Sequence, residues 1–264
     1  MKQQMETIKR YFKRFSKKED RKNRDSSASS DKNAILIGLN YPGTRYALKG
    51  CVNDVKNGDK FLKDHRYKTK VLTDKDVSQK YNILENLSEL GKSKEKRLFF
   101  HYSGHGTQTL DKNGDESDGL DEAIFSSNGL IIVDDQINET LTHFPVDKTV
   151  ILLFDCCHSG SIADLPYTLT PVGYLTEKVV KNVNTKVICI SGCKDPQTSA
   201  DITQGGISYG ALSQTLYSLL RKNKKRTWRQ FYTELLYEMQ RKGYQQIPLI
   251  SASNPSIFDE EIQI

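Results

Sequence analysis

Short apolar runs alternate with longer amphipathic stretches from residue 34 to the end of the chain. The runs are rich in branched residues and are bounded by polar ones, as are strands that are buried on both faces of a parallel sheet. The stretches between them repeat apolar residues every three or four positions, which is typical of helices with one buried face. The pattern predicts strands at residues 34–39, 70–73, 98–102, 150–154, 186–191 and 247–251.

The stretches between the strands predict helices and one hairpin. Because strands alternate with helices, we expect an α/β fold whose mainly parallel, six-stranded central sheet is flanked by helices on both faces. A small β-hairpin is predicted over residues 123–133. The predicted helices cover residues 51–65, 76–90, 134–144, 207–221 and 228–242.

The beginning of the chain differs from the rest in charge and in pattern. Residues 1–32 hold eleven basic and five acidic residues, which accounts for the whole net charge of +6. Residues 5–15 predict a short basic amphipathic helix, and the serine-rich residues 16–33 predict a flexible linker. The helix is either a weak membrane-surface or partner-binding segment or a pro-segment that lies on the body, and the sequence leaves both open. We expect an extension, residues 1–33, followed by one domain, residues 34–264.

Composition favours a soluble protein. The chain has 264 residues, 36% hydrophobic and 27% charged, and no apolar stretch approaches the roughly 18 residues that span a bilayer. Basic residues interrupt the first apolar positions, so no signal peptide is expected. Five cysteines, with Cys156 and Cys157 adjacent, make a poor disulfide framework and favour a reducing compartment. We expect a cytoplasmic protein and, because residues 33–264 are electroneutral, no nucleic-acid partner.

Two predicted strands end in reactive side chains. One continues into Ser103-Gly-His-Gly106 and the other into Asp155-Cys-Cys-His-Ser-Gly160. Ligands of open α/β sheets bind beyond the carboxyl ends of the strands, where neighbouring parallel strands would bring these residues together. A cysteine thiolate is a nucleophile that a nearby histidine can activate, and the histidine can protonate the leaving amine. The two strand ends therefore predict a Cys–His catalytic site.

Strand alternation sorts the residues at these ends. Ser103 and His105 point to one side, as do Asp155 and Cys157, whereas Cys156 points to the other side and is expected to pack in the core. Cys157 is therefore the predicted nucleophile. The glycines on either side of His105 leave room for a substrate backbone, and the second of them can aim its amide at a developing oxyanion.

Zinc binding is the competing interpretation of these residues. Three consecutive residues cannot all face one ion, and the glycines prevent a helix from stacking His101 over His105. The usual paired spacing of zinc ligands is also absent. A zinc site formed by His101, His105, Cys156, Cys157 and His158 is therefore not expected.

Three motifs together resemble those of metacaspases, a family of caspase-like cysteine peptidases. They are Tyr102-Ser-Gly-His-Gly106, the Asp155 motif quoted above, and Ser191-Gly-Cys-Lys-Asp-Pro-Gln-Thr-Ser-Ala-Asp201. His105 and Cys157 are 52 positions apart, near the roughly 50 of caspases, but the Gln-Ala-Cys form of true caspases is absent. The resemblance implies a caspase-like fold with a large-subunit-like region, residues 34–175, and a small-subunit-like region, residues 186–264, as in type I members.

The resemblance also implies the roles of several residues. His105 and Cys157 would form the catalytic dyad, the amides of Gly106 and Cys157 would form the oxyanion hole, and cleavage would follow Arg or Lys. The residues support a cationic substrate independently, because two carboxylates beside a dry pocket suit a long cationic side chain. For Asp54 a charge favoured at a helix start is the alternative. The expected pocket residues are Cys51, Asp54, Ser103, Asp155 and Ser191.

An acidic loop, residues 111–122, suggests a cation site. An EF-hand is excluded because Glu116 stands where the calcium loop requires glycine. The resemblance to metacaspases nevertheless implies a Ca²⁺ ion outside the catalytic centre, and carboxylate ligands suit calcium. A solvated loop, with one of two aspartates capping a helix, is the alternative. The expected ligands are Asp121, Asp134, Asp135 and Asp164.

The leading hypothesis is a calcium-dependent, monomeric cysteine endopeptidase that cleaves after Arg or Lys through an acyl-enzyme. The alternative is a catalytically silent or weak caspase-fold scaffold that binds a partner. Lys178, Lys181 and Lys186 lie between the two subunit-like regions. They are either sites at which a zymogen cleaves itself or surface lysines, and the sequence does not choose between these interpretations.

Overall fold

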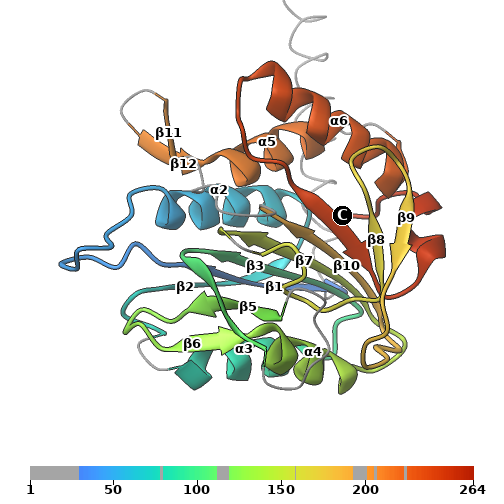
Figure 1. The fold of residues 1–264 in the computed structure, drawn as a ribbon, viewed down its shortest axis with the longest axis horizontal. Coiled ribbons are helices and arrows are strands. Elements are labelled where there is room, and N and C mark those ends of the chain that lie inside the picture. The colour runs from blue at the N-terminus through green and yellow to red at the C-terminus, as the bar shows by residue number, and fades with distance from the viewer. Residues whose placement is uncertain are drawn as a thin grey trace, which may run out of the picture. The chain divides into compact units, whose positions relative to one another are not determined.

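An eight-stranded mixed sheet lies at the centre of the structure (Figure 1). The computed structural model describes residues 30–77, 80–111, 119–157, 159–192, 201–204, 207–222 and 225–264. The strand order is β2-β1-β3-β7-β10-β13-β8-β9, in which the first five strands are parallel and the last three run antiparallel to their neighbours. In chain order the strands are β1 (Lys32–Gly38), β2 (Lys68–Thr73), β3 (Arg97–Ser103), β7 (Thr149–Asp155), β8 (Tyr167–Leu169), β9 (Leu175–Glu177), β10 (Lys186–Ser191) and β13 (Leu249–Ala252).

The six predicted strands all form, but the predicted strand number was wrong. A short hairpin, β8 and β9, extends the sheet beyond β13. Each of its strands has three residues, which is too short for a hydrophobic pattern, and β9 is fully exposed. The predicted N-terminal helix and most of the predicted linker lie outside the described residues.

Alternation along the central strands builds two separate cores. In β7, Ile151 and Leu153 enter one core, while Val150, Leu152 and Phe154 enter the other. Helices α2 (Cys51–Asp64), α5 (Ala211–Leu220) and α6 (Trp228–Arg241) cover the first face, and α3 (Lys80–Lys92) and α4 (Asp134–Thr142) cover the second (Figure 1). A 3₁₀ helix, η1 (Pro255–Asp259), follows the last strand. The prediction of a sheet buried by helices on both faces is confirmed.

Two predicted helices begin later than expected. Residues 76–79 precede α3, and residues 207–210 form strand β12 (Ile207–Gly210) instead of the first turn of α5. β12 pairs antiparallel with β11 (Asp201–Gln204), and this partner cannot be recognised from the local pattern of the segment. The pairing holds Gly210 in an extended conformation, with φ −72° and ψ 137°, directly before α5.

The predicted hairpin forms and gains a third strand. Strands β5 (Leu120–Phe125) and β6 (Ile131–Val133) are antiparallel, and β4 (Gly106–Leu110) pairs with the other side of β5. β4 begins three residues after β3 ends, so the chain turns immediately at this edge of the central sheet. The small sheet therefore starts at one of the two reactive strand ends.

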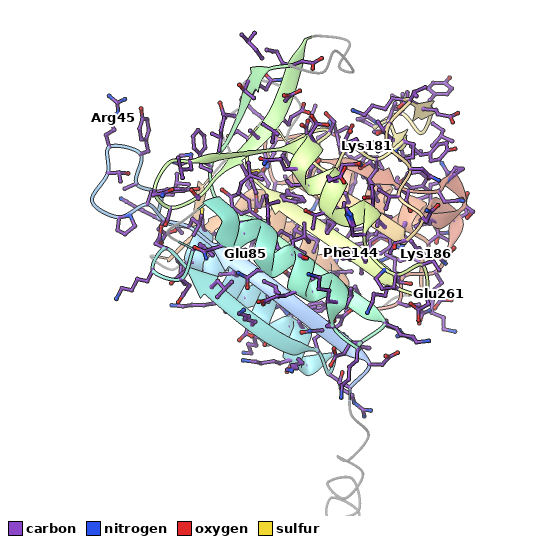
Figure 2. The ribbon with its side chains drawn as sticks, turned by 90° about the horizontal axis from the view of Figure 1, so that it is seen from below. Arg45, Glu85, Phe144, Lys181, Lys186 and Glu261 are labelled. Carbon is purple, nitrogen blue, oxygen red and sulfur yellow. The ribbon has the colours of Figure 1, made fainter. Side chains whose placement is uncertain are left out.

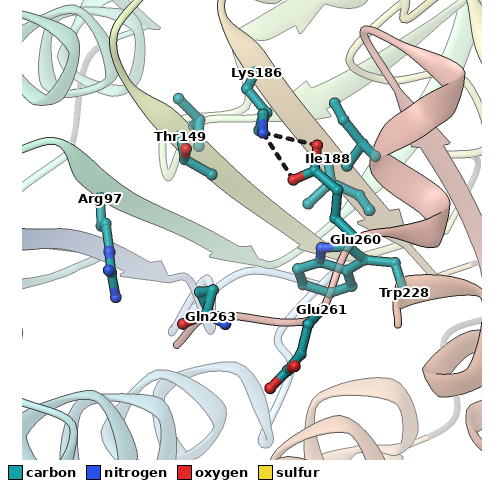
Figure 3. Close-up of a pocket in the computed structure, with 10 residues that line it drawn as sticks. Arg97, Thr149, Lys186, Ile188, Trp228, Glu260, Glu261 and Gln263 are labelled. Atoms are coloured by element: carbon teal, nitrogen blue, oxygen red, sulfur yellow. Dashed lines mark hydrogen bonds and ion pairs between the residues drawn. The ribbon is translucent and has the colours of Figure 1, made fainter. Parts of the chain in front are cut away.

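The carboxyl ends of the central strands meet at one edge of the sheet. Ser103 at the end of β3 pairs in register with Asp155 at the end of β7. The opposite edge holds a cavity of about 210 Å³, where Lys186 and Glu260 form an ion pair at 2.7 Å beside Trp228 (Figure 3). Arg45, on the loop that follows β1, and Lys186, the first residue of β10, lie on opposite sides of the view in Figure 2. The reactive residues thus share the carboxyl edge, and the cavity at the amino edge contains none of them.

Among the described helices, none combines the length and the apolarity that crossing a bilayer requires. 

The packing of Gly58 in α2 can be tested by substitution. A Cβ atom at this position would lie 2.5 Å from the Tyr217 hydroxyl and 2.9 Å from Leu36 Cδ2. Alanine usually stabilises a helix interior relative to glycine by about 0.5–1 kcal/mol. Here we expect Gly58→Ala to lower the free energy of unfolding by about 1–3 kcal/mol, because the added methyl group would overpack the core. Urea unfolding measures the change, with exposed Lys56→Ala on the same helix as a control, and a stabilised Gly58→Ala protein would contradict the packing.

Candidate active site

His105 lies just beyond β3 with its ring between two tyrosines. The ring centroid of Tyr41 is 4.8 Å from that of His105, and the His105 Nε2 atom is 2.7 Å from the carbonyl oxygen of Tyr46. A carbonyl can only accept a hydrogen bond, so Nε2 carries the proton of the neutral imidazole. The unprotonated nitrogen is then Nδ1, which is available as a base.

Two tyrosine hydroxyls hold the backbone of His105. Tyr41 Oη accepts the N–H of His105 at 3.1 Å, and Tyr102 Oη lies 2.9 Å from the His105 carbonyl oxygen and 2.9 Å from Tyr41 Oη. Burial raises the pKa of both tyrosines, so both hydroxyls stay protonated. Tyr41 has a φ of 48°, and the carboxylate of Asp74 accepts its N–H at 2.7 Å. His105 is therefore held by side chains that were not among the predicted site residues.

Cys157 is half-buried two residues beyond the end of β7. Its neighbour Cys156 is fully buried in the core, as predicted. A Cβ atom on Gly106 would lie 1.9 Å from the carbonyl oxygen of Cys157, so only glycine lets the two backbones come this close. The residues that follow the two strands are thereby side by side, His105 and Gly106 from β3 and Cys157 from β7.

Two buried carboxylates converge beside this pair. Asp54 accepts hydrogen bonds from the Ser103 hydroxyl and the Gly210 amide, each at 2.8 Å, and Asp155 accepts one from the Ser213 amide at 2.8 Å. A Cβ atom on Gly210 would lie 2.3 Å from Asp155 Oδ2 and 2.9 Å from Asp54 Oδ2. Four elements, α2, β3, β7 and the start of α5, therefore contribute to one acidic cluster.

Among the other expected pocket residues, Ser191 is buried at the end of β10, paired in register with Phe154. Cys51 is buried at the first position of α2, close enough to Tyr41 and Tyr102 to contribute to their raised pKa. Gly210 and Ser213 were not among the predicted site residues, because the predicted helix began at residue 207, where the structure has strand β12. A glycine directly before an apolar helical pattern was the available signal.

His101 lies beneath the acidic cluster as a structural residue. It is fully buried, with Nε2 at 3.1 Å from the Ser213 hydroxyl and Nδ1 at 3.0 Å from the Tyr217 hydroxyl. Burial lowers its pKa from 6.5 to about 3, so the imidazole is neutral. His101 thereby ties the first turn of α5 to β3.

The expected calcium ligands lie around the start of α4. Asp134 accepts the N–H of Glu122 at 3.0 Å and that of Asp135 at 2.8 Å. Burial, with the charges of Glu122 and Asp164, raises the pKa of Asp134 to about 9. Asp121 and Asp164 are buried, and Asp135 is half-buried.

The same cluster already contains one cation, the ammonium group of Lys178, which forms an ion pair with Asp164. No group of three side chains within the described ranges is arranged to hold a metal ion as it stands. The alternative that Asp134 or Asp135 caps α4 was wrong, because the N-cap is Val133 and both aspartates follow it in the first turn. The donor chemistry still fits a hard cation, since carboxylate oxygens are the ligands that Ca²⁺ prefers.

The three lysines between the subunit-like regions are all in ion pairs. Lys178 pairs with Asp164, Lys181 with Glu139 at 3.0 Å, and Lys186 with Glu260 at 2.7 Å (Figure 2 labels the last two lysines). Self-cleavage after one of them stays a prediction. His158, residues 112–118 and residues 193–200 of the third motif lie outside the described residues.

A sheet of this topology, with a histidine and a cysteine beyond two neighbouring strand ends, defines the caspase-like class. Two solved structures have the same fold. A protein of Geobacter sulfurreducens has a TM-score of 0.65 at 23% sequence identity. The match covers 87% of this chain and 97% of that protein's chain. Caspase-1 of Spodoptera frugiperda has a TM-score of 0.59 at 15% sequence identity, and the match covers 84% of this chain and 86% of the caspase chain. At these identities the likeness concerns the fold alone.

Sequence relatives identify the family within this class. The model of the metacaspase peptidase C14 domain matches residues 32–166. Metacaspase-1 of Cryptococcus neoformans is 33% identical over 87% of this chain and 64% of its own length, and Metacaspase-1 of Coccidioides immitis is 35% identical over 87% and 63%. Metacaspase-1B of Neurospora crassa is 34% identical over 88% and 69%. The chain belongs to the metacaspase family of cysteine peptidases, and it spans slightly less than two thirds of the first two relatives.

The burial of His101 predicts a pH dependence of stability. Below pH 6.5 the unfolded chain binds a proton at this histidine that the folded protein does not bind until about pH 3. Stability that is present above pH 6.5 is therefore lost as the pH falls, with a slope of about 1.4 kcal/mol per pH unit from this group. We expect His101→Gln to remove that part of the slope between pH 6 and pH 4 in urea unfolding. The same substitution at exposed His143 is the control, and an unchanged slope in His101→Gln would refute the assignment.

Proposed function

We propose that this chain is a cysteine endopeptidase that cleaves after Arg or Lys. The close approach of Gly106 to the Cys157 backbone is the observation that carries the proposal, because it joins the histidine of one strand end to the cysteine of the next. Acyl transfer by a cysteine peptidase requires a thiol and a nearby imidazole, and these two strand ends supply them.

In the proposed reaction, His105 takes the proton of the Cys157 thiol, and the thiolate attacks the carbonyl carbon of the scissile bond. The carbon–nitrogen bond then breaks as His105 passes this proton to the leaving amine, which leaves an acyl-enzyme thioester. Water, deprotonated by His105, then hydrolyses the thioester and restores the thiol. The bond from His105 to the Tyr46 carbonyl supports Nδ1 as the nitrogen that exchanges the proton. The amides of Gly106 and Cys157 are proposed to stabilise the oxyanion.

The acidic cluster supports the proposed specificity. Asp54 accepts hydrogen bonds from the Ser103 hydroxyl and the Gly210 amide, and Asp155 accepts one from the Ser213 amide, so neutral donors hold two carboxylates side by side. A guanidinium or ammonium group on a long side chain would complement them with charge-assisted hydrogen bonds. We propose that Ser103, Cys51 and Ser191 complete the pocket.

A peptidase assay tests both the dyad and the specificity. Fluorogenic peptides that end in Arg or Lys should be hydrolysed in the presence of reductant and calcium, and a peptide that ends in Asp should not. Cys157→Ala and His105→Ala are each expected to lose at least about 10³-fold in kcat. Cys156→Ala is the matched control, because Cys156 is buried in the core.

Activity that survives in Cys157→Ala would contradict the proposed nucleophile. Absence of turnover in the folded protein, together with a binding partner that Cys157→Ala still retains, would favour the scaffold interpretation instead.

We also infer that the cluster at the start of α4 binds Ca²⁺ through Asp121, Asp134, Asp135 and Asp164. The environment of Asp134 supports this, because burial, with the nearby charges of Glu122 and Asp164, raises its pKa, and a divalent cation would favour the charged carboxylate. In this proposal the four aspartates would hold the ion, and Asp164 would exchange its ion pair with Lys178 for the ion. The ion would supply charge to order this region and would lie outside the dyad.

Calcium binding can be measured independently of activity. We expect calcium at ten times its Kd to stabilise the protein by about 1.4 kcal/mol relative to chelator, from the linkage between binding and folding. Asp164→Asn should weaken binding at least tenfold in titration calorimetry, and Lys178→Gln should tighten it because no ammonium competes. Asp147→Asn, at an exposed carboxylate outside the cluster, is the control. A protein whose unfolding is insensitive to calcium would exclude the site.

A further inference from the structure

A second cavity reaches the candidate dyad from the histidine side only. It has a volume of about 630 Å³, within the range of about 300–1,000 Å³ that is usual for ligand sites. The loop of residues 41–46 forms one wall, and residues 125–129, at the turn between β5 and β6, form the other, with His105 and Gly106 at the base. Among the described lining residues are neither Cys157 nor Asp54 and Asp155.

The cavity lies where the part of a peptide after the cleaved bond would be bound. During acyl transfer, the half before the bond stays on the cysteine sulfur, and the half after the bond departs from beside the imidazole that protonates it. The acidic cluster would hold the Arg or Lys side chain of the first half. A cavity that includes His105 but not Cys157 is therefore placed for the second half.

The lining indicates which side chain the cavity takes. Tyr41, Tyr46 and Phe125 supply aromatic surface, and the described lining contains no carboxylate. Arg45 is the charged residue of the wall, with its guanidinium carbon 4.7 Å from the Tyr46 ring centroid, and it lies on the projecting loop (Figure 2). Aromatic walls bury apolar side chains favourably, whereas lysine or arginine would meet Arg45 without a counter-charge.

We propose that this cavity is the leaving-side subsite, which binds a large apolar side chain within the first two residues after the cleaved bond. The inference rests on the proposed peptidase function for its catalytic meaning. Its binding chemistry can be tested without turnover.

The kinetic test compares internally quenched peptides with the same Arg before the bond and either Phe or Gly at both positions after it. We expect kcat/KM to be at least about tenfold higher for the Phe peptide, the discrimination that an apolar pocket typically gives. Thr107→Trp fills the cavity from β4 and should bring this ratio close to one. Gln108→Trp, on the opposite face of the same strand, is the matched control and should keep the preference.

The binding test uses full-length Cys157→Ala and a fluorescent hexapeptide that begins with two Phe or two Gly residues. The Phe peptide should bind at least about tenfold more tightly, and Thr107→Trp should remove the difference. Asn128→Trp fills the cavity from the other wall, so the test does not depend on one variant folding. The protein could bind the Phe hexapeptide selectively and yet hydrolyse neither the quenched peptides nor a coumarin amide of arginine. That result would support the subsite and reject the peptidase function.

Equal cleavage and equal binding of the Phe and Gly peptides would overturn the subsite. A preference that survives both blocking variants would overturn it as well. A third outcome would assign the cavity to the chain's own N-terminal segment. In that outcome a synthetic peptide of residues 5–15 displaces the bound fluorescent hexapeptide, and an unlabelled Phe peptide does not.

Discussion

The parallel pairing of β3 with β7 is the constraint on which the rest of the site depends. Its register sets Ser103 opposite Asp155, so the two strands end at the same level. His105 and Cys157 are each the second residue beyond the end of their strand. If one strand slipped by one residue against the other, its alternating side chains would enter the wrong cores. The core that stabilises the sheet therefore also holds the histidine and the cysteine in their mutual position.

Two glycines convert that pairing into a site. Without a side chain at Gly106, the chain leaving β3 passes directly over the backbone of Cys157, and without one at Gly210, the chain entering α5 passes between Asp54 and Asp155. The backbone segments that carry His105, Cys157 and the two carboxylates are thus packed directly against one another. Tyr41 and Tyr102 extend this rigidity to the backbone of His105.

The two carboxylate clusters handle buried charge in different ways. Asp54 and Asp155 accept hydrogen bonds from a hydroxyl and from backbone amides, which stabilise the charged form without neutralising it. The cluster at α4 instead raises the pKa of Asp134 and pairs Asp164 with Lys178. In the proposed function the first cluster receives a cationic side chain of the substrate. The second holds the ammonium of Lys178, for which Ca²⁺ would compete in the proposed function.

The sequence alone determined the features that repeat locally. Apolar runs and helical periodicity located six strands, the hairpin and the two covered faces, and alternation separated buried Cys156 from Cys157. Only the tertiary structure decided the features that depend on distant partners. These are the β8–β9 extension, the pairing of β12 that delays α5, and the convergence of Gly210 and Ser213 on the acidic cluster. A short strand or a lone tyrosine such as Tyr41 has no periodic pattern, so its role appears only when the fold brings its partners to it.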